Sequence, residues 1–274
     1  MNPSELPDTD LLRAAAVTVG TEAAELVQRL RGGLDRFAGE VDTKSTETDV
    51  VTAADKASEQ LVRARLAELR PGEAVLGEEG GSDSSGERLL WVVDPIDGTV
   101  NYLYGLPWYA VSVAAQFDGV TVAAAVVEPA SGRVWSAVRG GGATLDGVPL
   151  RAAETTRLDL SLVGTGYAYA AERRARQADL SALLARRTRD LRRTGSAALD
   201  LCAVAAGWLD AYYEHGLGRW DWAGGSLIAE EAGAVLRLPD GSDDGLGGDI
   251  TLAAAPGIAE DLAEALRVAG AAEV

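Results

Sequence analysis

Hydrophobic side chains recur every three or four positions over two long segments near the N-terminus, a spacing typical of amphipathic helices. The first segment covers residues 10–34, and Gly32 marks its end. The second covers residues 53–69 and is followed by Pro71, which stops a helix. The inner face of this second helix is predicted to carry Leu61, Leu66 and Leu69.

The central part of the chain carries shorter apolar runs with the patterns of β-strands. Short strands are predicted at residues 74–76 and 91–93, separated by a glycine- and serine-rich loop at 80–87. Three further runs are joined by Asp-Gly and Ser-Gly turn signals. They predict an antiparallel meander over residues 110–116, 120–127 and 134–138.

After Pro149, predicted strands and helices alternate along the chain. The strands are placed at residues 160–164, 191–193 and 211–214, and the helices at 170–187, 196–206 and 221–231. A glycine- and aspartate-rich loop at 239–249 precedes a last strand and helix. The alternation predicts a layered second half. We place a boundary near residue 150, between an N-terminal subdomain with an antiparallel sheet (1–150) and a C-terminal subdomain (151–274).

The composition is that of a globular chain that folds without disulfides. Of its 274 residues, 47% are hydrophobic, and the single cysteine, Cys202, is typical of a reducing compartment. No stretch reaches the roughly 18–20 consecutive apolar residues of a membrane span. The N-terminus also lacks the basic start of a secretory signal. We therefore expect a soluble, cytoplasmic protein with no membrane partner.

The charge balance narrows the choice of partners. The chain has 42 acidic and 25 basic side chains, for a net charge of -17. Such a balance argues against a surface that binds nucleic acid by counterion release. It would also repel a phosphorylated substrate unless bound cations invert the field locally.

The most informative segment is residues 91–101, where an apolar run ends in two carboxylates three positions apart, Asp94 and Asp97. Carboxylates so placed can share hard divalent cations such as Mg²⁺. Gly98 and Thr99, if they begin a helix, offer backbone N–H groups to an anion. The segment therefore predicts a metal site beside a phosphate pocket.

The sequence contains few of the residues that other kinds of catalysis need. With one histidine, His215, and one cysteine, zinc ligation and Ser-His-Asp or Cys-His catalysis are disfavoured. Oxygen ligands are plentiful instead, because Glu78, Glu79, Glu214 and Asp221 accompany the two aspartates. Mg²⁺ takes few carboxylates and keeps water and substrate phosphate as further ligands, so three or four acidic side chains suffice for two ions. A two-metal phosphoryl hydrolase is predicted.

Several blocks of the sequence resemble the inositol monophosphatase family. They are GEEG at 77–80, DPIDGTVN at 94–101 and WDWAGG at 220–225, followed by EEAG at 230–233. The resemblance covers residues 44–233 in the family's order. It implies an α+β fold, the layered α-β-α-β-α sandwich of the inositol monophosphatase and fructose-1,6-bisphosphatase type. It also implies a lithium-sensitive, Mg²⁺-dependent phosphatase that forms a homodimer.

The resemblance further implies a set of metal ligands. Carried over position by position, Glu78, Asp94 and the Ile96 carbonyl hold one Mg²⁺. Asp94, Asp97 and Asp221 hold a second, and a third, looser ion lies by Glu78. The N-terminal subdomain thus supplies every ligand except Asp221, which comes from the C-terminal subdomain and completes the site.

The same resemblance implies the residues that act on the substrate's phosphate. Thr99, paired with Asp55, positions and deprotonates the attacking water, and Glu78 is counted with them as catalytic. The Gly98 and Thr99 N–H groups bind the phosphate. Metal coordination lowers the pKa of bound water, so hydroxide becomes available near neutral pH without a histidine.

On the leaving-group side the resemblance implies a polyol pocket. Gly195, Ser196 and Ala197 provide a backbone edge, and Glu214 provides a carboxylate. Asp221 is counted among the substrate contacts as well as the metal ligands.

Some matching or acidic residues have other interpretations. Lys44 and Asp49 match the family pattern, and we expect Lys44 to be auxiliary on a loop near the site. Glu79 is either a ligand or a solvated neighbour of Glu78, since adjacent residues on an extended segment point opposite ways. Asp221 can cap the helix that follows it, which does not exclude metal ligation. Asp200 is expected to be a buried, hydrogen-bonded structural group.

We therefore expect an Mg²⁺-dependent phosphatase that hydrolyses inositol 1-phosphate or a similar small polyol monophosphate with metal-activated water. A histidinol-phosphate phosphatase and a sugar bisphosphatase on the same metal core are alternatives, which differ on the substrate side of the pocket. An alternative of another class is a regulatory protein-binding module, because some proteins that resemble this family bind transcription or ribosome-associated proteins or RNA.

Overall fold

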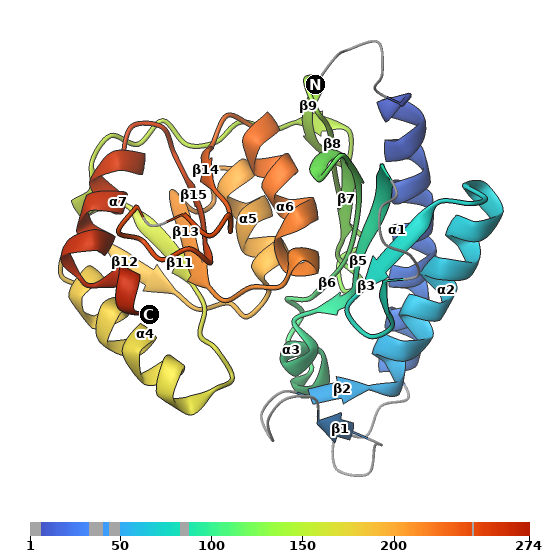
Figure 1. The fold of residues 1–274 in the computed structure, drawn as a ribbon, viewed down its shortest axis with the longest axis horizontal. Coiled ribbons are helices and arrows are strands. Elements are labelled where there is room, and N and C mark those ends of the chain that lie inside the picture. Colours follow the sequence, from blue (N-terminus) through green and yellow to red (C-terminus); the bar gives the residue numbers. More distant parts are fainter. Residues whose placement is uncertain (1–6, 33–40, 44–49, 83–87, 243) are drawn as a thin grey trace.

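Helices and β-sheets alternate in five layers in the computed structural model of this chain (Figure 1). The structure describes residues 7–32, 41–43, 50–82, 88–242 and 244–274. From right to left in Figure 1, the layers are α1 (Thr9–Arg31) with α2 (Ala53–Leu69), an eight-stranded sheet, α5 (Ala197–Ala205) with α6 (Arg219–Glu231), a five-stranded sheet, and α4 (Ala171–Leu184) with α7 (Ala259–Val268). The layered α+β fold expected from the sequence is confirmed.

The eight-stranded sheet is antiparallel except at one pairing. Its spatial order is β10 (Val148–Pro149), β9 (Gly142–Leu145), β8 (Val134–Val138), β7 (Val120–Val127), β6 (Ala110–Phe117), β5 (Leu89–Asp97), β3 (Ala74–Gly77) and β4 (Gly81–Ser82). The predicted meander of β6, β7 and β8 is confirmed. The antiparallel sheet expected in this part of the chain has one parallel pairing, because β4 folds back on the outer edge of β3 and β5 then pairs with β3 in parallel.

The five-stranded sheet is mixed, and it lies in the layered second half that the alternation of strands and helices predicts. Its order is β12 (Asp190–Arg192), β11 (Leu162–Thr165), β13 (Ala211–His215), β15 (Ile250–Ala254) and β14 (Val235–Arg237). β11 is parallel to both of its neighbours, and β15 is antiparallel to both of its own. The remaining short elements are α3 (Thr99–Tyr104), β1 (Val41–Thr43), β2 (Val50–Thr52) and two 3-10 turns at Leu158–Leu160 and Ala271–Glu273.

Three hydrophobic clusters of buried side chains fill the spaces between the layers. In the first, α1 packs Leu12, Val19 and Val27 against the larger sheet. In the second, all nine residues of α5 are buried, which explains why every residue of this helix except Asp200 is apolar. In the third, α4 and α7 cover the smaller sheet with Leu180 and Leu262.

Two adjacent glycines let α6 approach its neighbours on both sides. A Cβ on Gly224 would lie 2.6 Å from the Ser112 hydroxyl of β6, and a Cβ on Gly225 would lie 2.7 Å from the Leu201 Cβ of α5. Neither position has room for a side chain. Because α6 begins at the functional site described below, this close packing fixes where its first turn lies.

The predicted helices and strands mostly agree with the structure to within three residues. α2 has the predicted bounds, and α1 ends at Arg31, with Gly32 as its cap residue. The strand predicted at 160–164 begins at Leu162, because residues 158–160 form a 3-10 turn. Six of the described strands were not predicted: β1, β2, β4, β9, β10 and β14, each two to four residues long. Such runs are too short to show a periodicity.

The inner face of α2 differs from the prediction. Leu66 is buried as expected, but Leu69 is 42% exposed. Three polar side chains, Asp55, Ser58 and Glu59, are buried on this helix instead. Their spacing of three and four residues places them on one face.

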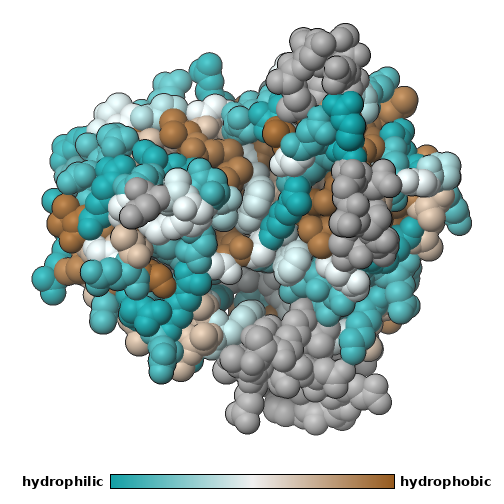
Figure 2. All heavy atoms as spheres, viewed as in Figure 1, coloured by the Kyte–Doolittle hydropathy of each residue, from teal (hydrophilic) through white to brown (hydrophobic). Residues whose placement is uncertain are grey.

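The face of the molecule drawn in Figure 2 is mostly polar. On the face shown in Figure 2, hydrophilic side chains predominate and hydrophobic ones form separate small groups. Within the described ranges, no helix combines the length and the apolar character needed to cross a membrane. The boundary proposed near residue 150 stays a prediction.

Replacement of Gly225 by Ala is expected to lower the free energy of unfolding by about 1–3 kcal/mol, because the new methyl group overpacks the contact with Leu201. This loss exceeds the gain of up to about 1 kcal/mol in helix propensity. Urea denaturation followed by circular dichroism measures the change. Gly32→Ala is the control, because Gly32 has helical φ and ψ and no atom within 3.4 Å of the new Cβ, so its midpoint should hold or rise. An unchanged midpoint for Gly225→Ala would contradict this packing.

Candidate metal centre and active site

A break in the register of β5 brings two carboxylates to the same cavity. β5 pairs regularly with β6 as far as Asp94, and the register then shifts before Asp97. On a regular strand, residues three apart point to opposite faces. Pro95 has no N–H to donate to the ladder, and the Asp94 carboxylate accepts from the Ile96 N–H at 3.0 Å. The irregularity therefore turns Asp94 and Asp97 toward one side.

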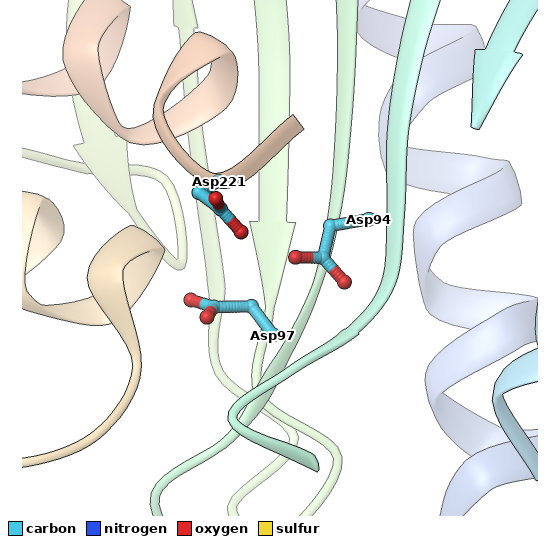
Figure 3. Close-up of side chains that lie close together, drawn as sticks. All are labelled: Asp94, Asp97 and Asp221. Carbon is cyan, nitrogen blue, oxygen red and sulfur yellow. The ribbon is translucent and has the colours of Figure 1, made fainter. Parts of the chain in front are cut away.

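A third carboxylate reaches the same place from the middle helical layer. Asp221 lies in the first turn of α6, where it accepts a hydrogen bond of 2.6 Å from the Gly218 N–H. Carboxylate oxygens of Asp94, Asp97 and Asp221 all lie within 4.8 Å of one another. Figure 3 shows the three side chains converging on a shared space. The predicted capping role of Asp221 is confirmed, and it leaves the carboxylate facing the cluster.

Burial and mutual repulsion perturb the three carboxyl groups. Burial raises the pKa of Asp94 well above its ordinary value, and Glu78 and Asp97 add to the effect. Burial likewise raises the pKa of Asp221 far above normal, with Asp97 as the next cause. The pKa of Asp97 rises only to about 6, because hydrogen-bond donors partly offset its burial. Three oxygen donors that repel one another when ionised fit a hard divalent cation, whose charge would relieve the repulsion.

The hydrogen-bond donors that offset the burial of Asp97 belong to the start of α5. Asp97 accepts from the Ser196 hydroxyl at 2.6 Å and from the Ala198 N–H at 2.7 Å, with the Ala197 N–H at 3.3 Å. A carboxylate is well placed there, because the N-terminus of a helix leaves N–H groups unpaired. Ser196 and Ala197, predicted as substrate contacts, thus also hold Asp97 in place.

Glu78 and Ile96 complete the predicted ligand set at the wall of the same cavity. Glu78 follows β3, and its backbone N–H donates to the Val93 carbonyl at 3.3 Å. It is close enough to raise the pKa of Asp94 and of Asp221. The structure therefore places Glu78 beside the three aspartates, while its role as a ligand stays a prediction.

A chain of buried hydrogen-bonding groups leads from the cavity to α2. The Thr99 hydroxyl lies 3.1 Å from the Asp55 carboxylate and 3.0 Å from the Ile96 carbonyl. Asp55 is fully buried and does not line the cavity, and its other oxygen accepts from the Thr52 N–H at 2.8 Å. Asp55 therefore caps α2 and is linked to the site through Thr99.

Gly98 is required by its conformation and by its surroundings. Its φ of +91° lies in the left-handed region, and a Cβ would come within 3.1 Å of the Gly195 carbonyl and the Trp108 carbonyl. The chain therefore turns sharply after Asp97 and enters α3 at Thr99, as expected from the sequence.

The cavity has a volume of about 410 Å³, within the range of small-molecule sites. Among the predicted site residues, only Asp55 stands behind its wall. Those lining it are Glu78, Asp94, Ile96, Asp97, Gly98, Thr99, Gly195, Ser196, Ala197, Glu214 and Asp221. Lys44 and Asp49 lie outside the described residues.

The side of the cavity away from the three aspartates carries further ionisable groups. Burial raises the pKa of Glu214 to about 7, although Glu214 accepts a hydrogen bond of 2.6 Å from the Tyr212 hydroxyl. Burial also raises the pKa of Asp200 to about 8, and Asp200 accepts from the Thr194 hydroxyl, as a structural group would. His215 is buried, with Nε2 2.7 Å from the Leu246 carbonyl oxygen, as expected for a structural histidine.

Arg193 is the main residue of this side that the sequence analysis missed. It lines the cavity from the end of the five-stranded sheet, and its charge lowers the pKa of Asp97, Asp200 and Glu214. Its side chain is the same as those of the other arginines around residue 190, so residue type does not distinguish it. The sequence feature that could have identified Arg193 is its position just before Thr194-Gly195-Ser196, because Gly195 and Ser196 were predicted as substrate contacts.

The sequence pattern of the inositol monophosphatase family matches residues 8–271. This chain belongs to the inositol monophosphatase family. It is 51% identical over 279 residues to the inositol-1-monophosphatase of Mycobacterium leprae, covering 96% of each chain. The structure of Mycobacterium tuberculosis SuhB aligns with a TM-score of 0.83 and 43% identity, covering 97% of this chain and 100% of that one.

A more distant relative carries a different kind of name. The Nus factor SuhB of Pseudomonas aeruginosa is 38% identical over 240 residues, covering 84% of this chain and 86% of that protein. Membership of the inositol monophosphatase family confirms the predicted enzyme class, a phosphatase, and the predicted fold. The described residues also contain the acidic cluster that a metal-dependent member needs.

Asp200→Asn is expected to gain stability relative to the wild type as pH rises from about 5 to about 9. A carboxyl whose pKa is about 8 in the folded protein, against roughly 3.9 when unfolded, stabilises the fold fully below about pH 4. This contribution is lost as pH rises through about 8. The amide of Asn does not titrate, so the variant has no corresponding contribution to lose. Urea unfolding in a chelator at several pH values measures the difference. Asp179→Asn, on the exposed side of α4, is the surface control. A constant difference for Asp200→Asn would contradict the assignment.

Proposed function

We propose that this protein is an Mg²⁺-dependent phosphomonoesterase that hydrolyses inositol 1-phosphate or a similar small polyol monophosphate. The observation that carries the proposal is the triad of Asp94, Asp97 and Asp221 at one end of a cavity of small-molecule size. The relative from Mycobacterium leprae is named inositol-1-monophosphatase, which supports this substrate class.

The proposed metal ligands follow the family resemblance and the geometry of the cavity. Glu78, Asp94 and the Ile96 carbonyl would hold one Mg²⁺, and Asp94, Asp97 and Asp221 would hold a second, with room for a third ion by Glu78. When bound, Mg²⁺ supplies a Lewis acid that acidifies water and stabilises charge on the phosphoryl oxygens and the leaving oxygen.

The protein's own groups would orient the attacking water and accept its proton. The Thr99 hydroxyl faces the cavity and lies 3.1 Å from the Asp55 carboxylate. Thr99 Oγ1 would receive a proton from water and pass its own to Asp55, a transfer that needs only the existing hydrogen bond. The Gly98 and Thr99 N–H groups, at the start of α3, would hold the phosphate.

The far side of the cavity would hold the leaving group. Glu214 would accept a hydrogen bond from a substrate hydroxyl, and Gly195 and Ala197 provide the backbone edge beside it. Asp221 belongs to the metal cluster, and Glu214 is close enough to raise its pKa, so Asp221 would touch both ions and substrate. An acidic wall that accepts hydrogen bonds suits a polyol, because hydroxyl groups donate them.

Two related phosphatase activities differ only on this side. A histidinol-phosphate phosphatase would use Glu214 and Asp200 to attract the substrate's cation, and both line the cavity. A sugar bisphosphatase would use Arg193 for the second phosphate.

A regulatory role as a protein-binding module is the candidate of another class. The Nus factor name of the Pseudomonas aeruginosa relative supports it. A net charge of -17 suits a basic protein partner better than a nucleic acid. The homodimer and the cytoplasmic location also stay predictions, the first from the family resemblance and the second from the single, buried Cys202.

A panel of phosphate esters ranked by kcat/KM in Mg²⁺ tests the substrate class. Inositol 1-phosphate or a similar polyol ester is expected to lead, and millimolar Li⁺ is expected to inhibit the same turnover. If histidinol phosphate leads by about a hundredfold, the polyol assignment is wrong. Absence of phosphate release from every ester, together with a stable bound protein partner, would favour the regulatory candidate.

Asp94→Asn tests the metal cluster. Asp94 is chosen rather than Asp97, because Asp97 also caps α5 and its loss would disturb the fold. Turnover is expected to fall by more than about a hundredfold, as a ligand charge is lost. In a chelator near pH 8, the melting temperature is expected to rise, since one of three repelling charges is gone.

Enzyme assays and differential scanning fluorimetry measure the two effects. Asp118→Asn, which removes an exposed ion pair with Arg88, is the control and should change both quantities little. Normal turnover by Asp94→Asn would remove Asp94 from the ligand set.

A further inference from the structure

The polar face of α2 contacts three parts of the metal centre. Asp55 meets Thr99, the Ser58 hydroxyl donates to the Pro95 carbonyl at 3.1 Å, and Glu59 meets the segment after Glu78. Asp55, Ser58 and Glu59 are at most 3% exposed. A helix in this position normally buries apolar side chains, so three buried polar ones call for a specific reason.

Glu59 and Arg63 form a clamp around the turn that follows β3. One oxygen of Glu59 accepts from the Glu79 N–H at 2.8 Å, and the other accepts from the Gly80 N–H at 2.9 Å. Arg63 pairs with Glu59 at 2.8 Å and donates to the Gly81 carbonyl at 2.7 Å. The clamp therefore binds this turn on both its donor and its acceptor side.

The sequence of the turn leaves room for the clamp. A Cβ on Gly77 would lie 2.3 Å from the carboxyl carbon of Glu59, and a Cβ on Gly80 would lie 2.7 Å from one of its oxygens. Neither glycine has positive φ, so the backbone conformation does not require them. They are explained by the close approach of Glu59 to the two residues that flank Glu78 and Glu79.

We propose that Glu59, held by Arg63, is a positioning residue for the metal centre: it fixes the turn that presents Glu78 to the three aspartates. The inference rests on the proposed function, because it takes Glu78 as a ligand. Groups that orient a metal ligand without touching the metal typically change metal affinity by about 10–100-fold when they are replaced. Glu59 meets that description, since it binds both N–H groups that follow Glu78 along the turn.

Glu59→Gln tests the proposal in the full chain. The side chain keeps its size, but its amide presents N–H donors to one of the two backbone N–H groups and loses the charge that pairs with Arg63. Calorimetric titration of the chelator-treated protein with Mg²⁺ is expected to show a dissociation constant about tenfold higher. In the enzyme assay, the Mg²⁺ concentration for half-maximal rate should rise in parallel, while kcat at saturating Mg²⁺ should recover most of its value. A purely structural role would lower the melting temperature and leave the Mg²⁺ titration unchanged.

Two further variants serve as a negative and a positive control. Glu22→Gln is the matched control, because Glu22 belongs to α1, pairs with Arg65 of α2 at 2.6 Å and does not line the cavity. Its Mg²⁺ dissociation constant should equal that of the wild type. Glu78→Gln is the positive control and should weaken Mg²⁺ binding at least as much as Glu59→Gln.

The outcomes separate the two proposals. Normal Mg²⁺ binding by Glu59→Gln, with weak binding by Glu78→Gln, would overturn the positioning role and leave the proposed function intact. Normal binding by Glu78→Gln would overturn both the ligand assignment and the positioning role. If Glu59→Gln does not fold, Arg63→Lys replaces it, because Lys keeps the charge but loses the fork that reaches the Gly81 carbonyl. Unchanged Mg²⁺ binding by Arg63→Lys would equally overturn the proposal.

Discussion

Repulsion between buried carboxylates is the constraint around which the structure is organised. Asp94, Asp97 and Asp221 lie within 4.8 Å of one another and are largely removed from water, an arrangement that raises their pKa values and destabilises the ionised, metal-free chain. Nothing in the three side chains themselves holds them together. The surrounding fold must therefore hold them together, and the contacts around the cavity can be understood as the means by which it does so.

Packing between strands and helices fixes the backbone at each of the three aspartates. Asp94 and Asp97 are fixed by an irregularity in a strand whose apolar neighbours are fully buried, and Asp221 is fixed because Gly224 and Gly225 seat α6 tightly between the larger sheet and α5. Apolar burial contributes about 1.5–3 kcal/mol for each large side chain, and the middle cluster contains many such groups. This burial opposes the repulsion between the carboxylates.

The sequence predicted the layers and the ligands more fully than the contacts around them. Long periodic segments such as α1 and α2 and the meander of β6 to β8 were predictable because their patterns extend over many residues. Asp94 and Asp97 were predicted from two carboxylates at the end of an apolar run, Asp221 from the supply of oxygen ligands, and their assignment to particular ions from the family resemblance. Their convergence depends on the packing of α6 and on a strand irregularity that periodicity does not show. Glu59 and Arg193 were missed because each looks like an ordinary helix or loop charge. Glu59 binds backbone N–H groups 20 and 21 positions away in sequence, and Arg193 acts on Asp97 from the end of another sheet, relations that the fold creates.

Asp97 shows why the metal centre and the fold cannot be treated separately. It extends from the larger sheet, yet it accepts hydrogen bonds from the first turn of α5 in the middle layer, so one carboxylate serves as a helix cap and as a proposed ligand. The Asn101 side chain makes a parallel link, because its amide donates to the Thr194 carbonyl at 2.8 Å, just before α5. Each link joins residues more than ninety positions apart, and Asp97 and Ser196 line the cavity. A shift of α5 would therefore move Asp97 and the Gly195 to Ala197 edge together, so the proposed metal and leaving-group sides of the pocket keep a fixed relation.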